Sequence, residues 1–268
     1  MANNQVPKVL IFSTAYFPLV GGAEVAVKEI TDRIGDFEFD MITAKIQRGL
    51  KKEEKINNIN VYRVGFGFNL DKYLLPFLGL KKAISLNKKR DYKLTWSIMA
   101  SFGGFLGLRF KKKFPDKPWL LTLQEGDPLE EIKKKVGVFG FWFKQIFKHT
   151  DYIQAISIFL SNWAKEMGAK NPGEVVPNGV DIKVFKPEEN LSNRNEKVIL
   201  TVSRLVKKNG VDDLIKAGQY LDFNFKMIII GDGPDRSELE KLVSKLNLED
   251  KVIFKGNANY HDLVKYYS

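Results

Sequence analysis

Short apolar segments alternate with helical segments along most of this 268-residue chain. The apolar segments are continuous rather than alternating with polar residues, which is typical of strands buried on both faces. Helices between such strands indicate parallel sheets, so the pattern predicts an α/β fold. The predicted strands are 9–12, 39–43, 59–64, 119–123, 152–156, 174–177, 198–202, 226–230 and 252–254, and the predicted helices are 23–34, 212–220 and 235–246.

A polar segment divides the predicted strands into two groups. Residues 186–197 (KPEENLSNRNEK) have no apolar period and carry one proline, as interdomain linkers do. We therefore predict a Rossmann-like domain over residues 1–185 and a second one over residues 198–268. A complete domain of this kind has about six strand–helix units, and the second group supplies about three strands.

Cysteine and histidine counts exclude several kinds of site. The chain has no cysteine and only two histidines, His149 and His261. A disulfide scaffold, a cysteine nucleophile and a cysteine-ligated metal are excluded, and little remains for a Ser-His-Asp triad. The longest uncharged runs, residues 94–108 among them, have 15 residues and fall short of the ~20 residues of a membrane-spanning helix. No signal peptide is recognisable, so we predict a cytoplasmic location and no metal site.

Positive charge is concentrated in one part of the chain. The formal net charge is +11, and residues 72–149 alone hold 17 Lys and Arg against 6 Asp and Glu. The remaining residues are balanced, so the sequence predicts one basic face and an anionic partner. Nucleic acid, an anionic membrane surface and a phosphate-bearing substrate all fit this charge.

Residues 133–144 mix lysines with aromatic side chains, as segments that lie in membrane interfaces do. This pattern predicts peripheral attachment to the inner face of a membrane. The alternative is a core helix, because Phe139, Trp142, Phe143 and Phe147 have the spacing of one buried helical stripe.

Glycines and basic residues follow several predicted strands. Gly21 and Gly22 lie between the first strand and the first helix, where backbone amides can approach a phosphate. Arg204, Lys207 and Lys208 follow the first strand of the second domain, at the sheet edge where α/β proteins bind ligands. Taken singly, these motifs also fit an ordinary turn and a solvated basic loop.

The next strand of the second domain ends in a further glycine turn, which contains Gly231 and Gly233. Four strings occur in order along the chain: GGAE, VPNGVD, SRLV followed by GVDDLIKA, and IIGDGPDRSELEKL followed by VIFKG. In these strings the chain resembles the retaining glycosyltransferases of family four. The resemblance covers nearly the whole chain. It is specific from Val175 onward and matches in outline over residues 69–114.

The resemblance implies a GT-B fold, with the acceptor mainly on the first domain and a UDP- or GDP-sugar donor mainly on the second. It implies metal-independent transfer of a hexosyl group to a glycan or lipid-linked acceptor, with no cofactor. Arg204, with Lys207 or Lys208, would pair with the diphosphate, and Gly21 and Gly22 would lie near the donor phosphates or the acceptor. In the nucleotide pocket the resemblance places Gly231, Gly233, Lys255, Gly256, Asn257 and Ala258.

Three departures from the family pattern matter for function. Gln124 stands where the family commonly has His; it can hydrogen-bond a sugar hydroxyl but cannot take up a proton. Asn209 stands where Lys is usual, so Lys207 or Lys208 would supply that charge. The family's E-x7-E motif would follow Ser268. We therefore expect little or no transferase activity from these 268 residues alone.

Sugar transfer is the function that the sequence favours. The first alternative is a non-catalytic or truncated member that binds nucleotide sugar, acceptor or an anionic membrane without turnover. A nucleic-acid-binding α/β protein is the second alternative, and it rests only on the basic region 72–149.

Overall fold

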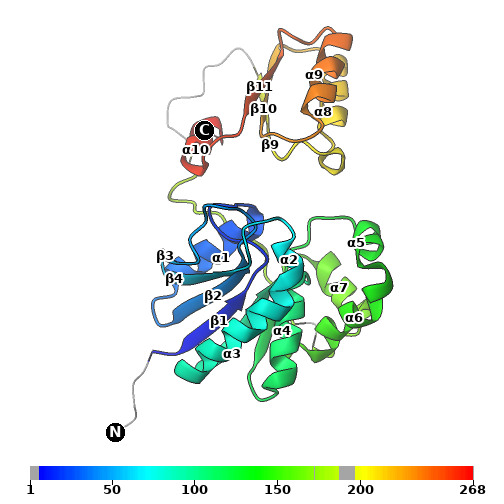
Figure 1. Ribbon diagram of the computed structural model, residues 1–268. Helices are drawn as coiled ribbons and strands as arrows, with labels where there is room; N and C mark the ends of the chain where they lie inside the picture. The colour runs from blue at the N-terminus through cyan, green and yellow to red at the C-terminus, as the bar shows by residue number, and fades with distance from the viewer. Residues whose placement is uncertain (1–5, 172, 187–196, 268) are drawn as a thin grey trace. The chain divides into compact units, whose positions relative to one another are not determined.

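The computed structural model describes residues 6–171, 173–186 and 197–267. The chain forms two compact units, Met1–Gly179 and Val180–Ser268. Each unit contains its own sheet with helices packed against it (Figure 1). The α/β fold expected from the alternation of strands and helices is confirmed.

The described residues of the first unit form an eight-stranded sheet in the order β3-β4-β2-β1-β5-β6-β7-β8. All neighbouring strands are parallel except β3 and β4. The strands are β1 Lys8–Phe12, β2 Glu38–Ala44, β3 Glu53–Ile56, β4 Ile59–Val64, β5 Tyr92–Ile98, β6 Trp119–Leu123, β7 Tyr152–Ala155 and β8 Glu174–Val175. The helices are α1 Gly22–Arg33, α2 Asp71–Leu74, α3 Leu80–Lys89, α4 Phe102–Lys113, α5 Leu129–Val136, α6 Gly140–His149 and α7 Ile158–Glu166.

The first strand is buried on both faces, which explains its continuous apolar sequence. Val9 and Ile11 pack with Val27 of α1, while Leu10 and Phe12 pack in a separate cluster that includes residues of α3 and α4. Helix α1 covers one face of the sheet, and α3 and α4 cover the other (Figure 1). Apolar side chains therefore fill both layers of the core, and polar groups are left to the strand ends.

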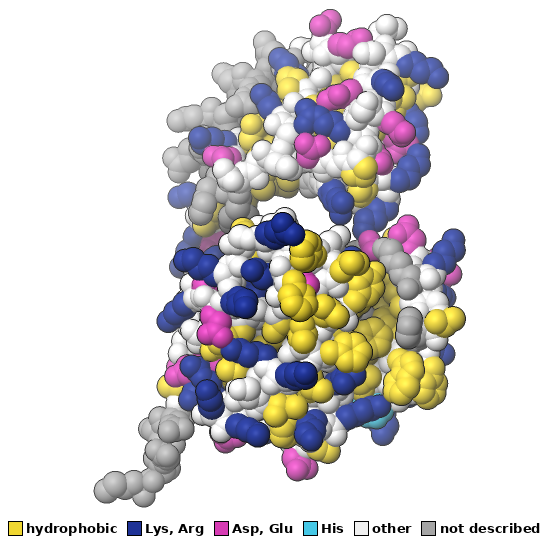
Figure 2. Space-filling view, in the orientation of Figure 1, with side chains coloured by type: hydrophobic (Ala, Val, Ile, Leu, Met, Phe, Trp, Pro, Cys, Tyr) yellow, Lys and Arg dark blue, Asp and Glu magenta, His cyan; other side chains and the backbone are white. Residues whose placement is uncertain are grey.

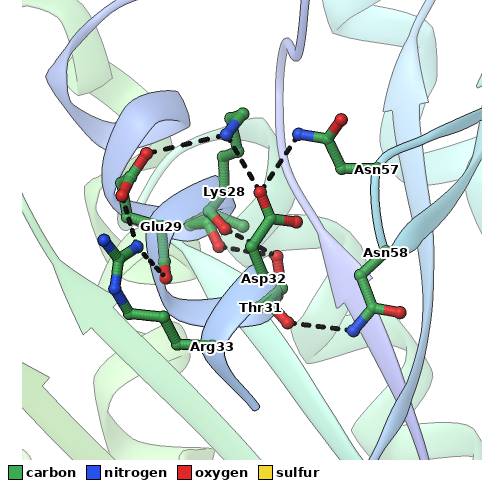
Figure 3. A network of polar contacts seen from close by, with 8 residues as sticks. Lys28, Glu29, Thr31, Asp32, Arg33, Asn57 and Asn58 are labelled. Atoms are coloured by element: carbon green, nitrogen blue, oxygen red, sulfur yellow. Dashed lines mark hydrogen bonds and ion pairs between the residues drawn. The ribbon is translucent and has the colours of Figure 1, made fainter. Parts of the chain in front are cut away.

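Helix α1 is fastened to the turn between β3 and β4 (Figure 3). Asn57 Nδ2 donates to Asp32 Oδ2 over 3.1 Å, and Lys28 Nζ donates to the same oxygen over 2.9 Å. Asn58 Nδ2 donates to the carbonyl of Thr31 over 2.9 Å. These bonds fix the C-terminal half of α1, and with it the glycine turn at the helix N-terminus.

Two strands of the first unit were not expected from the sequence. Strand β5 contains Thr95 and Ser97, which are buried although they are polar. Thr95 Oγ1 donates to the Pro118 carbonyl over 3.0 Å, and Ser97 Oγ accepts from Trp119 Nε1 over 2.9 Å. These bonds let a mixed polar and apolar segment occupy a central strand. Strand β3 is an edge strand, and its charged residues gave no apolar signal.

The second unit has three parallel strands in the order β11-β10-β9 within the described residues. The strands are β9 Lys197–Val202, β10 Phe225–Ile230 and β11 Val252–Gly256, and the helices are α8 Val211–Ala217, α9 Arg236–Lys245 and α10 Tyr260–Tyr267. Ile215, Met227 and Leu239 are in its core, so the strand–helix alternation expected here forms one packed unit.

The boundary between the units differs from the predicted one. It lies between Gly179 and Val180, six residues before the predicted end of the first domain. Phe185 belongs to the second unit because its ring packs edge-to-face on Tyr267, with centroids 5.8 Å apart. Of the predicted linker 186–197, residues 187–196 lie outside the described residues, and Lys197 is already part of β9.

We predict that Gly107→Ala destabilises the first unit by roughly 1–3 kcal/mol, because the added methyl overpacks a closed core. A Cβ at Gly107 would lie 2.3 Å from Ser97 Oγ and 2.6 Å from the Trp119 ring. Urea unfolding followed by tryptophan fluorescence measures this, since all four tryptophans lie in the first unit. Gly140→Ala is the matched control, because no atom lies within 4 Å of its added methyl. Equal stability of the two variants would contradict the packing argument.

Candidate functional site

The carboxyl ends of β1 and β5 form the switch point of the first sheet, the place where open α/β sheets bind ligands. The chain leaves β1 for α1 on one face and leaves β5 for α4 on the other. Thr14 Oγ1 and Ser101 Oγ, from the loops after these strands, are 3.0 Å apart. A Cβ on Gly103 would meet the Phe12 carbonyl at 2.8 Å, so glycine is required for α4 to begin here.

In the first unit, a carboxylate of the protein itself is bound at the glycine turn that was predicted to bind phosphate. Gly21 and Gly22 are exposed at the N-terminus of α1. The Gly21 amide donates to Glu24 Oε2 over 2.7 Å, so that amide is already paired. A phosphate that used this amide would first have to displace the Glu24 side chain, which sequence reasoning did not foresee.

Gln124 and Glu125 follow β6 at the same sheet edge. Gln124 is 8% exposed, and its Nε2 has no hydrogen-bond partner among the described residues. Glu125 Oε1 accepts from the Ala100 amide over 2.6 Å, while its buried Oε2 has no partner in the described part of the chain. Burial raises the pKa of Glu125 to about 7. Sequence reasoning selected Gln124 and missed Glu125, whose only signal was an acidic residue directly after a buried strand.

In the second unit the predicted basic residues differ in their partners. Lys207 Nζ pairs with Asp212 Oδ2 at 3.3 Å, and Lys208 is exposed. Arg204 is also exposed, and its guanidinium has no acidic partner among the described residues. Asn209 Nδ2 donates to the Arg204 carbonyl over 2.6 Å, so Asn209 holds the backbone of this loop. Arg204 is therefore an exposed cation at this strand end, without an acidic partner among the described residues.

The two glycines after β10 permit a backbone contact between neighbouring strand-end loops. A Cβ at Gly231, whose φ is +130°, would lie 1.9 Å from the Ser203 carbonyl oxygen, and one at Gly233 would lie 2.2 Å from that of Leu205. The Leu205 amide donates to the Asp232 carbonyl over 3.0 Å. Glycine is thus required at both positions, and the contact fixes the Arg204 loop beside the loop that follows β10.

Most of the predicted loop 255–258, whose first two residues belong to β11, lines a pocket of about 470 Å³. Lys255, Asn257 and Ala258 contribute to it, but Gly256 does not. Gly256 has a φ of +70°, and its carbonyl accepts from the Gly231 amide over 2.8 Å, so it has a structural role here. The remaining lining residues, which sequence reasoning did not select, are Asn259, Asp262, Lys265 and Tyr266.

Comparisons with known proteins agree with this architecture. Residues 183–268 match the family model described as glycosyl transferases group 1. An uncharacterized glycosyltransferase of Methanocaldococcus jannaschii is 29% identical over 255 residues, which cover 91% of this chain and 65% of that protein. The lipopolysaccharide core biosynthesis glycosyltransferase LpsD of Rhizobium meliloti is 32% identical over 228 residues, 82% of this chain and 62% of that protein.

Solved structures have the same fold. Sucrose-phosphate synthase from Thermosynechococcus elongatus matches 98% of this chain and 73% of its own, with a TM-score of 0.79 and 20% identity. Anabaena HepE in complex with UDP and glucose matches 97% and 71%, with a TM-score of 0.71 and 18% identity. The chain therefore has the GT-B fold.

The chain spans 65% of the first M. jannaschii relative and 71% of a second uncharacterized glycosyltransferase from that organism. The likeness to glycosyltransferases of the GT-B fold, which the strand-end motifs indicated, is confirmed. Within the described residues, no three His, Cys, Asp or Glu side chains gather as a metal site would, and no helix is long and apolar enough to cross a membrane.

We predict that Glu125→Gln changes how stability depends on pH. Since the pKa of Glu125 is raised from 4.5 to about 7 in the folded protein, its stabilising contribution is full below pH 4.5. That contribution is lost as the pH rises through 7. Gln cannot ionise and still accepts from the Ala100 amide. The variant should therefore gain about 3 kcal/mol relative to wild type between pH 4.5 and pH 8.

Urea unfolding at a series of pH values, followed by tryptophan fluorescence, measures this difference. Glu24→Gln serves as the control, since Glu24 sits at the solvent-exposed glycine turn. A difference between wild type and Glu125→Gln that stays constant with pH would contradict the assignment.

Proposed function

We propose that the protein transfers a sugar from a nucleotide-sugar donor to a hydroxyl group of an acceptor. The observation that carries the proposal is the Arg204 guanidinium, which lacks an acidic partner in the described residues at a strand-end loop held by Gly231 and Gly233. In transfer, the acceptor hydroxyl oxygen bonds to the sugar's anomeric carbon while the bond between that carbon and the diphosphate breaks. The electron pair of the broken bond stays on the diphosphate, which also takes up the hydroxyl proton. Arg204 stabilises this developing charge.

The proposed donor is a UDP- or GDP-hexose bound without a metal, as in retaining glycosyltransferases of family four. The pocket lined by Asn257, Lys265 and Tyr266 supports the proposal, because it offers an amide, a cation and an aromatic ring for a nucleoside. The UDP complex of HepE is a further support from a protein of the same fold.

The proposed acceptor is a glycan or a lipid-linked sugar that binds the first unit. Gln124 supports this proposal, because its buried Nε2 has no partner among the described residues and can donate to a hydroxyl oxygen. Among the relatives, alpha-monoglucosyldiacylglycerol synthase of Streptococcus pneumoniae is 22% identical over 97% of this chain. We accordingly place the protein in the cytoplasm, peripherally on the inner face of the membrane. Nucleic acid is the less favoured partner, because none of the strand-end features described above indicates nucleic-acid binding.

We predict that Arg204→Ala weakens binding of the matching nucleoside diphosphate by roughly 1.5–3 kcal/mol, the value of a hydrogen bond to a charged group. Calorimetric titration with UDP, GDP and ADP identifies the base and measures the loss. Lys245→Ala removes the same charge from α9 and should leave binding unchanged. Equal affinities of wild type and Arg204→Ala would remove Arg204 from the phosphate site.

A turnover assay tests the reaction itself. The 268-residue chain is incubated with a panel of UDP- and GDP-hexoses, and release of the nucleoside diphosphate is followed with and without glycan or lipid-linked acceptors. We predict acceptor-dependent release of one nucleoside diphosphate, together with binding of that nucleoside diphosphate. Absence of transfer with every donor and acceptor would contradict the proposed reaction, and absence of binding to every nucleotide would contradict the proposed donor site.

A further inference from the structure

In the first unit, cationic side chains lie over the faces of exposed aromatic rings. Arg48 lies over the ring of Phe68, with its Cζ 4.6 Å from the centroid, and Lys72 Nζ lies 5.4 Å from the centroid of Tyr73. Phe68 is 48% exposed and Tyr73 is 55% exposed. Each ring therefore presents an apolar surface to solvent beside a positive charge.

The same arrangement recurs on α4 and its neighbours. Arg109 Cζ lies 4.6 Å from the centroid of Phe77, and Lys112 Nζ lies 5.3 Å from that of Trp142. Both rings are more than half exposed. We call these four ring–cation pairs the aromatic–cation face. Figure 2 shows hydrophobic side chains gathered over α2, α4 and α6, with lysines and arginines among them.

The aromatic–cation face is continuous and firmly supported. Tyr73 packs edge-to-face on Phe102 of α4, with centroids 4.9 Å apart, so α2 and α4 are joined. Asp71 is buried, and its Oδ2 accepts the amides of residues 66, 67 and 68 over 2.8, 2.6 and 3.1 Å. These three hydrogen bonds hold the loop that carries Phe68 in place.

The charge of the supporting segments is almost entirely positive. Residues 66–89, α4 and α6 hold five, four and two Lys or Arg, and their one acid is the buried Asp71. Lys82 and Lys111 pair with acids outside these segments, Glu53 and Asp151. A second copy of this face would bring like charges together, whereas an anionic surface complements them.

We propose that the aromatic–cation face docks on an anionic lipid bilayer, with its rings at the headgroup boundary and its cations on lipid phosphates. The proposal builds on the location at the membrane and does not depend on sugar transfer. Of residues 133–144, the face includes Trp142. Phe143 and Phe147 of the predicted stripe are buried, whereas Trp142 is exposed and belongs to the face.

Flotation of the full chain with vesicles tests the proposal. Wild type should float with phosphatidylcholine–phosphatidylglycerol vesicles and not with phosphatidylcholine alone. Lys72→Gln/Arg109→Gln/Lys112→Gln should lower the partition coefficient roughly 100-fold, because each basic residue near an anionic surface contributes about fivefold. Lys165→Gln/Lys241→Gln/Lys245→Gln changes the net charge equally and should bind as wild type. Phe68→Ser/Phe77→Ser should lose binding with the net charge unchanged.

Four results would overturn the proposal. The first is a wild type that floats with neither vesicle, and the second is an equal loss in both triple variants, which would show an effect of net charge only. The third is loss of binding in Val138→Ser, an exposed position of the 133–144 segment, while the face variants keep it. Sedimentation without lipid detects self-association through the same residues, which would also count against a lipid partner. A failed turnover assay leaves all these readouts intact.

Discussion

Burial of the parallel strands on both faces is the constraint from which the rest of the structure follows. Side chains of β1 alternate between two separate apolar clusters, so neither face of this strand can carry polar chemistry. Polar and charged groups that contact a ligand must therefore lie in the loops at the strand ends. Gln124 and Glu125 in the first unit, and Arg204 in the second, all occupy such positions.

Close backbone contact gives these strand ends their shape. In the second unit, Gly231 and Gly233 let one loop lie directly against the carbonyls of another. Larger residues would separate the loops and move Arg204 away from the turn after β10. In the first unit, Gly103 has the same effect on α4, which begins against the carbonyl of Phe12. Glycines therefore determine where the polar and charged residues of these strand ends lie.

Much of this architecture could be predicted from the sequence, because apolar continuity reports burial on both faces directly. Strand β5 was not predicted because it contains the polar residues Thr95 and Ser97. Their burial depends on hydrogen bonds to Pro118 and Trp119, which are distant in sequence. The sequence motifs also located Arg204 and both glycines after β10. The partners of these groups could not be predicted. The ion pair between Lys207 and Asp212 depends on how the loop after β9 folds against α8. The hydrogen bond from the Ala100 amide to Glu125 depends on how the loops after β5 and β6 come together.

The carboxylate of Glu24 on the Gly21 amide has a consequence for any ligand that reaches this turn. Such a ligand does not enter an empty anion site but exchanges with an anion that the protein carries itself. The free energy gained at the Gly21 amide is therefore only the difference between its bond to the ligand and its bond to Glu24. The released Glu24 carboxylate returns to water. Exchange of this kind would favour a ligand that makes further contacts over a free inorganic anion.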